Sequence, residues 1–378
     1  MSLIELSSAN ELAVLAELSD SVFENEATRD LGNNSNLLKT SGLLDLQVNG
    51  FAGVDFNTSG LSAEVFDYVL ESMLSTGVTT FLATIITGTE AHLSACFEAL
   101  EESRNYSQLA KSMVAGYHLE GPFLSTLPGY SGCHPVEKMN VVDSEMFLRL
   151  QESAGGNIQL VTLAPEVEGA IPFIEKLVRD GIVVALGHTA AGSEIIRQAV
   201  DAGALLSTHL GNGTTAELRK NNNPIMDQLA EDQLSASFIA DGYHLSPEVL
   251  KVYLRAKESK RTILITDATA ATSASPGRYR LGDIELSLGS EPVICSPETN
   301  RPVGSVVTLD QCVRNVMRWY DMPLKEAVSW AAENPMQLLK SSKAQTLLSE
   351  QEKSVWWEEH TEGWHVKAAR SGKFLFKA

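Results

Sequence analysis

The stretch Tyr117-His118-Leu119-Glu120-Gly121-Pro122-Phe123 follows an apolar, β-compatible run over residues 112–116. Its Gly-Pro pair stops regular structure, so a buried strand should deliver one carboxylate, Glu120, to its C-terminal end. In parallel α/β sheets and barrels, that end of the strands is where chemistry takes place. A single glutamate in such a place is more often a solvated loop residue, so its meaning depends on how the other strands end.

Apolar strands alternate with amphipathic helical segments along most of the chain. The expected strands lie at 43–50, 78–86, 113–123, 158–165, 182–188, 204–209, 235–240 and 262–266. Eight strands alternating with helices over roughly 230 residues are typical of a (β/α)8 barrel. An open doubly wound sheet is the alternative, but the turn after the first strand, Asn49-Gly50-Phe51-Ala52-Gly53, lacks the G-x-G-x-x-G pattern.

The remaining segments predict a small appendage. Residues 11–23 have helical spacing, 279–295 alternate like a hairpin, and 355–357 and 364–376 have the composition of short strands. We expect these strands to pair beside the barrel. The predicted fold is therefore α/β, a TIM-type barrel over 41–340 with a small, partly β appendage formed by 1–40 and 341–378.

Composition excludes several classes of partner. The net charge of −19 argues against nucleic acid and against an anionic membrane surface, and any anionic substrate must be held by local groups. The four cysteines form no C-x-x-C pair, which indicates a reducing compartment. The first 20 residues lack a basic leader, and no apolar run reaches 18 residues, so the cytoplasm is the expected location.

Ionisable residues end the later strands too. The fifth, sixth and eighth strands end in His188, His209 and Asp267, and the seventh ends in Asp241 followed by His244. Each histidine alone is at least as often a hydrogen-bonded core residue, and each aspartate alone often caps a turn. Together with the glutamate of the third strand they form a set that chance rarely places on one rim. Glu plus two His is a known ligand set for catalytic zinc, and a neighbouring Asp can take a proton from water.

An ordered series of segments gives a specific resemblance. The chain resembles the amidohydrolase superfamily and, within it, the family of N-acetylglucosamine-6-phosphate deacetylases. The matching segments are Asp45-Leu46-Gln47-Val48-Asn49-Gly50, His118-Leu119-Glu120-Gly121-Pro122, Leu163-Ala164-Pro165-Glu166, Gly187-His188-Thr189, Thr208-His209-Leu210, Ile239-Ala240-Asp241-Gly242-Tyr243-His244 and Thr266-Asp267-Ala268-Thr269.

The resemblance implies a role for each matching residue. Glu120, His188 and His209 would bind the metal, Asp267 would be the catalytic acid and base, and His134 would contact the acetyl oxygen of the substrate. From sequence alone, His134 is more simply a surface histidine. The family's phosphate-binding arginine has no clean match, and Arg219 and Lys220 lie near its position. The implied substrate-binding residues are Gln47, Cys133, Asn212, Gly213, Lys220, His244, Val303 and Gly304.

The first strand indicates the number of metal ions. Many members of the superfamily have His-x-His at its end, whereas this chain has Gln47 and Asn49. Amides are poor ligands for transition metals, so one divalent metal per subunit is expected. Zinc is the expected ion, with iron, cobalt or manganese as alternatives.

The predicted activity is hydrolysis of the N-acetyl group of an amino sugar, with N-acetylglucosamine 6-phosphate giving acetate and glucosamine 6-phosphate. The resemblance also implies a homodimer. The alternatives are deacetylation of an unphosphorylated N-acetylhexosamine, hydrolysis of an N-acyl amino acid or a cyclic amide, and a sugar-binding barrel without catalysis. A binder would not need a general base, and the absence of a G-x-S-x-G motif disfavours a serine hydrolase.

Overall fold

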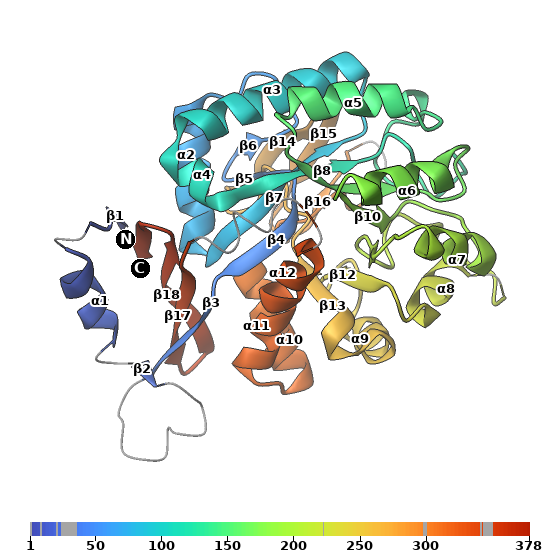
Figure 1. Cartoon of the computed structure of the whole chain (residues 1–378). Helices are drawn as coiled ribbons and strands as arrows, with labels where there is room; N and C mark the ends of the chain where they lie inside the picture. The colour runs from blue at the N-terminus through green and yellow to red at the C-terminus, as the bar shows by residue number, and fades with distance from the viewer. Residues whose placement is uncertain are drawn as a thin grey trace.

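A computed structural model describes residues 2–7, 10–19, 22–23, 36–221, 223–297, 301–340, 342 and 351–378. At its centre lies a parallel sheet in which sequence neighbours are also spatial neighbours (Figure 1). Its eight strands are β4 (Leu43–Val48), β7 (Val78–Ile86), β8 (Val114–Glu120), β9 (Ile158–Leu163), β10 (Val183–Leu186), β11 (Leu206–Ser207), β12 (Ser235–Ile239) and β13 (Thr262–Ile265). A parallel bridge between Val48 and Ala268 joins the first strand to the end of the last. The predicted TIM-type barrel is confirmed.

Burial on both faces explains the composition of these strands. All residues of β4, β7 and β8 are buried, as expected when helices cover one face and the barrel interior the other. The covering helices are α2 (Ala63–Ser75), α3 (Glu90–Tyr106), α4 (Gln108–Met113), α5 (Ser144–Ser153), α6 (Ala170–Arg179), α7 (Ser193–Asp201), α8 (Pro224–Ala230), α9 (Pro247–Arg261), α10 (Leu309–Tyr320), α11 (Leu324–Ala331) and α12 (Glu333–Leu339). The Ser246 hydroxyl accepts from the Val249 amide at the start of α9, and Pro247 follows at the first helical position.

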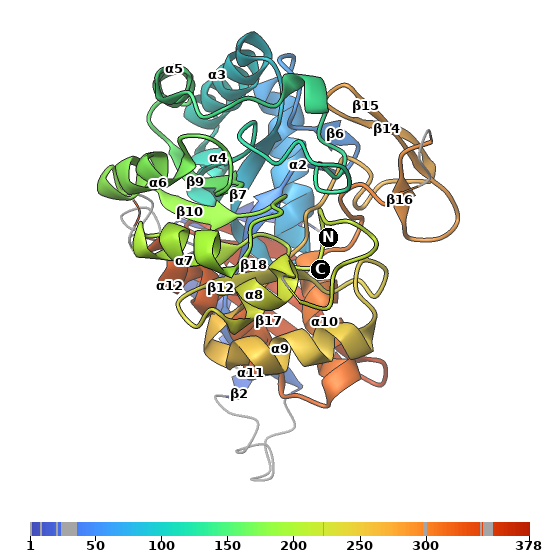
Figure 2. The same cartoon turned by 90° about the vertical axis from the view of Figure 1, so that its right-hand side faces the viewer.

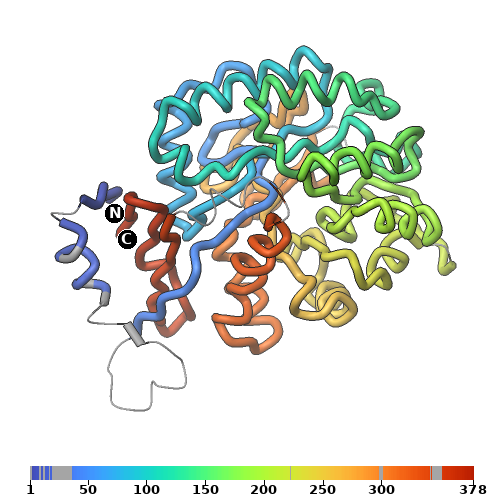
Figure 3. The backbone as a smooth tube through the Cα atoms, in the orientation of Figure 1, coloured from blue at the N-terminus to red at the C-terminus, as the bar shows by residue number. Residues whose placement is uncertain are grey.

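A six-stranded sheet stands beside the barrel. Its order is β1 (Ser2–Glu5), β19 (Phe374–Lys377), β18 (Gly363–Ser371), β17 (Lys353–His360), β3 (Leu37–Ser41) and β2 (Val22–Phe23). Because β1 pairs with β19, the two ends of the chain lie side by side (Figure 3). Helix α1 (Glu11–Ser19) is tied to this sheet by an ion pair of 2.7 Å between Glu11 and Arg370.

The strands expected at 279–295 belong to a third sheet, so their predicted pairing with the appendage is wrong. This sheet consists of β14 (Gly277–Leu281), β15 (Ile284–Leu288) and β16 (Ile294–Cys295), and Figure 2 shows it apart from the six-stranded sheet. Its apolar face packs on Ile86 and Val303, near the C-terminal ends of the barrel strands. The hairpin strands β5 (Gly50–Phe51) and β6 (Val54–Asp55) adjoin it, because the Gly282 amide donates to Asp55 across 2.7 Å.

The division of the chain at residues 41 and 340 stays a prediction, and residues 24–35 and 343–350 of the predicted appendage lie outside the described residues. The 3₁₀ turn η2 (Val136–Lys138) is joined to the third sheet by an ion pair of 2.5 Å between Lys138 and Asp283. Among the described residues, no helix combines the length and the apolar character needed to cross a membrane.

Candidate metal centre and active-site pocket

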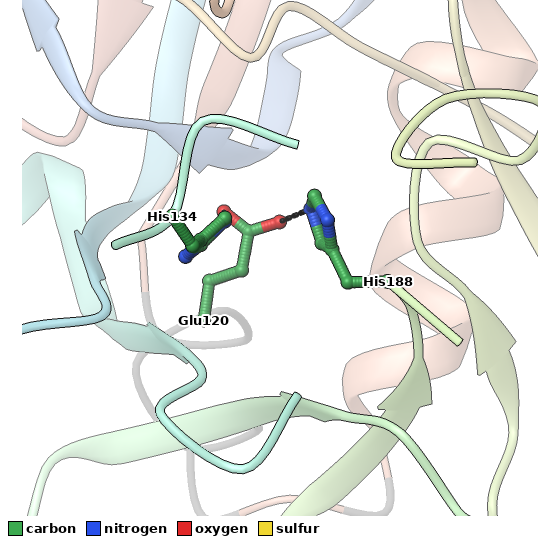
Figure 4. A group of neighbouring side chains, drawn as sticks. All are labelled: Glu120, His134 and His188. Atoms are coloured by element: carbon green, nitrogen blue, oxygen red, sulfur yellow. Dashed lines mark ion pairs between the residues drawn. The ribbon is translucent and has the colours of Figure 1, made fainter. Parts of the chain in front are cut away.

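The buried carboxylate of Glu120, at the end of β8, lies among three imidazoles. Its Oε1 is 2.9 Å from Nε2 of His209 and 3.4 Å from Nε2 of His188, and its Oε2 is 3.8 Å from Nε2 of His134. Figure 4 shows this carboxylate between the rings of His134 and His188. The predicted metal ligands therefore converge, although they are separated by almost 90 residues in the chain.

The protonation pattern of these groups fits a bound cation. The Nδ1 of His188 lies 2.9 Å from the carbonyl oxygen of Tyr130, so this nitrogen holds the ring proton. The Nε2 lone pair then faces a carboxylate oxygen, and two acceptors at this distance need a proton or a cation between them. In the described part of the chain every ion-pair partner of Glu120 is a histidine, so no lysine or arginine fills that role. Imidazole and carboxylate are suitable ligands for a divalent transition metal.

His134 lies closer to this centre than its loop position suggests. One ligand atom each from Glu120, His134 and His188 lie within 4.8 Å of one another, a spacing that could hold a metal ion. The Nδ1 of His134 is 2.8 Å from the hydroxyl of Thr87. Burial, with His188 beside it, lowers the pKa of His134 to about 3, so the ring is neutral. The surface location that sequence alone would favour for this histidine is wrong.

Asp267 follows β13 and is hydrogen-bonded by two amide side chains. Its Oδ1 accepts from Nδ2 of Asn49 at 2.7 Å and from Nε2 of Gln47 at 3.1 Å. Burial, and then the charge of Glu120, raise the pKa of Asp267 to about 6. Burial also acts to raise the pKa of Glu120, but its contacts with the His188 and His209 imidazoles hold it well below its ordinary value. The two carboxyl groups thus differ in proton affinity although they share one site.

The backbone bends at three of these residues. His188, His209 and Asp267 have φ values of 50°, 30° and 52°, in the left-handed region that costs a non-glycine residue energy. The bend at His209 explains why β11 ends at Ser207, before the predicted strand end at residue 209. Such strained residues gather at functional sites because the surrounding structure must hold them there.

The rings need room that two glycines provide. A Cβ on Gly213 would lie 2.6 Å from Nδ1 of His188, and a Cβ on Gly132 would lie 2.7 Å from its Cε1. Both glycines have positive φ, 61° and 59°, which disfavours other residues as well. The loops after β8 and β11 therefore approach the His188 ring from two sides.

A cavity of about 830 Å³ opens onto this site, and its floor is formed by Glu120, His134, His188, His209 and Asp267. Most predicted substrate-binding residues line it: Cys133, Asn212, Gly213, His244, Val303 and Gly304. Gln47 is buried, does not line the cavity, and donates from Nε2 to Oδ1 of Asp267. Lys220 is exposed and does not line the cavity either. The His244 ring is oriented by Asp241, whose Oδ2 lies 2.7 Å from its Nδ1.

Sequence reasoning missed several residues of this cavity. The third sheet contributes 281–285, and Lys138, Tyr243 and Arg301 also line the wall. Of these, only Tyr243 lies inside a matching segment and could have been inferred. The others come from loops whose position depends on long-range packing.

A comparison with known protein families identifies the class of enzyme to which the chain belongs. A model of the amidohydrolase family matches residues 33–345. The chain therefore belongs to the amidohydrolase family, whose members are metal-dependent hydrolases of carbon–nitrogen bonds.

Within this family several relatives share one name. The N-acetylglucosamine-6-phosphate deacetylase of Bacillus subtilis is 32% identical over 298 residues, covering 78% of this chain and 73% of the relative. That of Bos taurus is 33% identical over 310 residues, covering 79% and 73%. A mutant of the Mycobacterium smegmatis enzyme, solved in complex with N-acetyl-D-glucosamine-6-phosphate, is 28% identical with a TM-score of 0.79, covering 90% of this chain and 88% of that one.

Proposed function

We propose that this chain hydrolyses the N-acetyl group of N-acetylglucosamine 6-phosphate, giving acetate and glucosamine 6-phosphate. One observation supports this most directly. A buried Glu-His-His set and an aspartate of raised pKa share the floor of one cavity, in a chain whose relatives at 31–33% identity include deacetylases of this sugar phosphate.

Glu120, His188 and His209 would hold one divalent cation, with zinc the expected ion and iron, cobalt or manganese the alternatives. When bound, the cation supplies Lewis acidity, which makes water more acidic and polarises the acetyl carbonyl. The amides Gln47 and Asn49 occupy the place of further ligands and donate to Asp267, which supports a single-ion site.

Asp267 is proposed as the group that moves the proton. Its Oδ2 accepts a proton from the attacking water as the water oxygen bonds to the acetyl carbon. It then gives that proton to the nitrogen, so that the C–N bond breaks with a neutral amine leaving. His134 is proposed to donate from Nε2 to the acetyl oxygen as negative charge develops there. The Thr87 hydroxyl supports this role because it can donate to Nδ1, which leaves the ring proton on Nε2.

The sugar and its phosphate would occupy the upper cavity. Asn212, Gly213 and His244 line one side and are the proposed phosphate contacts, while Cys133, Val303 and Gly304 line the side proposed to cover the sugar. Lys220 lies outside the cavity of its own chain, so we propose that it reaches the phosphate in the partner subunit of a homodimer. The four cysteines are free thiols, which supports the proposed cytoplasmic location.

An acetate-release assay tests the proposal. The substrates are N-acetylglucosamine 6-phosphate, free N-acetylglucosamine, their galactose and mannose epimers, an N-acetyl amino acid and a cyclic amide. The highest kcat/KM is expected for N-acetylglucosamine 6-phosphate. A higher value for a free sugar would remove the phosphate from the assignment, and a higher value for the amino acid or cyclic amide would refute sugar deacetylation.

A further inference from the structure

The end of β4 presents two amide side chains to a single carboxylate oxygen. Gln47 and Asn49 are two residues apart, so both side chains leave the strand on the same face, toward the barrel mouth. Both side chains are buried, with relative exposures of 2% and 1%. Nε2 of Gln47 and Nδ2 of Asn49 donate to the same atom, Oδ1 of Asp267, at 3.1 and 2.7 Å. Two donors on one oxygen leave the other oxygen of that carboxylate chemically distinct.

Backbone hydrogen bonds fix the two strand ends relative to each other. The amide of Asp267 donates to the carbonyl of Gln47 at 3.0 Å, and the amide of Asn49 donates to the carbonyl of Ala268 at 2.8 Å. The parallel bridge between Val48 and Ala268 lies between these bonds. The amides therefore approach the carboxylate from regular, paired backbone, which is more rigid than a loop.

The orientation of the Asn49 amide is determined by this contact. If its oxygen faced Asp267, two acceptors would lie 2.7 Å apart, so the nitrogen must be the atom that faces the carboxylate. The Oδ1 of Asn49 is then buried without a hydrogen-bond partner in the described part of the chain.

The second oxygen of Asp267, Oδ2, accepts no hydrogen bond from the described residues. A Cβ on Gly304 would lie 4.0 Å from Oδ2, an ordinary van der Waals distance. Both residues line the cavity. The carboxylate thus has one oxygen held by the protein and one oxygen open toward a substrate.

We propose that Gln47 and Asn49 are positioning residues that hold Oδ1 of Asp267 and reserve Oδ2 for proton transfer. The inference rests on the proposed deacetylase function. In the first step an O–H bond of water breaks and an O–H bond forms at Oδ2. In the second step that bond breaks as an N–H bond forms on the leaving amine, so the proton is returned. Donors on Oδ1 prevent the carboxylate from rotating and from binding the proton on the oxygen that faces away from the substrate.

Gln47→Ala, Asn49→Ala and the double variant test this role. Each single variant should lose about 10- to 100-fold in kcat, and the double variant should approach the loss caused by Asp267→Asn. The KM and the metal content per chain should stay within about twofold of the parent. The acid limb of the pH profile of kcat/KM should move to higher pH, because two donors that favour the ionised carboxylate are lost. Gln228→Ala, which removes another buried amide that does not line the cavity, is the control and should behave as the parent.

Three outcomes would overturn the proposal. A raised KM with unchanged kcat would make these amides substrate contacts, and a fall in metal content would make them metal ligands. A crystal structure of the double variant gives a readout that needs no substrate. The Asp267 carboxylate should be rotated or disordered there, and an unmoved carboxylate would refute the inference. If the parent cleaves no N-acetyl sugar, the proposed function fails, and the orientation of this carboxylate still decides the positioning role.

Discussion

The imidazole of His188 donates from Nδ1 to the backbone carbonyl oxygen of Tyr130 across 2.9 Å. Since the acceptor belongs to the main chain of the loop after β8, no side-chain substitution at residue 130 removes it. The bond fixes the tautomer and the plane of a metal-binding ring, a role that outer contacts commonly have at metal sites. The position of that loop therefore controls how the His188 ring is oriented toward the metal. Substitutions that move the loop test this dependence.

Gly132→Ala should displace the His188 ring. The new Cβ would lie 2.7 Å from Cε1 of the ring, so either the loop or the ring must move. We expect metal content and turnover both to fall by at least about tenfold, as for loss of an outer contact of a metal ligand. Gly156→Ala is the matched control, because Gly156 also has positive φ but its Cβ would meet nothing within 4 Å. Metal content that stays at the parent level in Gly132→Ala would contradict the proposed dependence on this loop.

Asp267→Asn should retain the metal and the fold but lose about 10²- to 10⁴-fold in kcat, because an amide cannot accept and return the proton. Steady-state kinetics combined with elemental analysis and circular dichroism would check this. A variant with nearly normal kcat would remove Asp267 from the mechanism.

His188→Ala and His209→Ala should lower metal occupancy as well as activity, since each removes an imidazole that faces Glu120. His134→Ala should lower kcat while it keeps the metal, if this residue acts on the acetyl oxygen. Elemental analysis of dialysed protein separates the two roles. Loss of the metal in His134→Ala would make His134 a ligand instead, and two ions per chain in the parent would contradict the single-ion site.

Lys220→Ala and Arg219→Ala, singly and together, should raise KM for the phosphorylated sugar and leave that for the free sugar unchanged. A charge-assisted hydrogen bond contributes roughly 1.5–3 kcal/mol, or about tenfold to a hundredfold in KM. Lys260→Ala, an exposed lysine on α9, serves as the control for the loss of one positive charge. Equal KM changes for both sugars would show that these residues do not recognise the phosphate.

Asp45→Asn should change how stability depends on pH. Burial raises the pKa of Asp45 from 3.8 to about 7, although the Thr266 hydroxyl donates to it at 2.6 Å. Between these two values the folded chain binds a proton that the unfolded chain has released, so stability falls as pH rises and the loss is complete above about 7. The asparagine variant cannot ionise, so its Tm relative to the parent should rise between about pH 4 and about pH 7 and then stay constant. One pKa unit corresponds to about 1.4 kcal/mol of stability. A Tm difference between variant and parent that does not change with pH would show that Asp45 stays ionised in the fold.

Local pattern predicted the barrel because each strand is a short apolar run and each helix has one apolar stripe. The strands starting at Val78 and Ile158 begin where the sequence places them. The same pattern could not reveal contacts between distant segments. Asn49 and Asp267 are separated by 218 positions, and no local feature indicates that their side chains meet. The location of the third sheet was missed for the same reason, since alternation predicts a hairpin but not the surface on which it packs.

The strained bends at His188, His209 and Asp267 were also outside the reach of sequence patterns. None of these positions is a glycine, so nothing in the chain signals a positive φ. The segments Gly187-His188-Thr189 and Thr208-His209-Leu210 indicated the residues of the site through family resemblance, whereas their backbone geometry follows from the tertiary structure. Site identity was thus more predictable than site geometry.

The pairing of β1 with β19 has a consequence for synthesis on the ribosome. Ser2 to Glu5 are made more than 360 residues before their hydrogen-bonding partners, Phe374 to Lys377. The barrel strands, in contrast, each pair with the strand made just before, so the barrel can assemble progressively as the chain leaves the exit tunnel. The six-stranded sheet must wait, and until then its N-terminal strands expose unpaired edges that other chains could bind. We therefore expect the segment that contains β1 to depend most on a chaperone while the residues up to β19 are being synthesised.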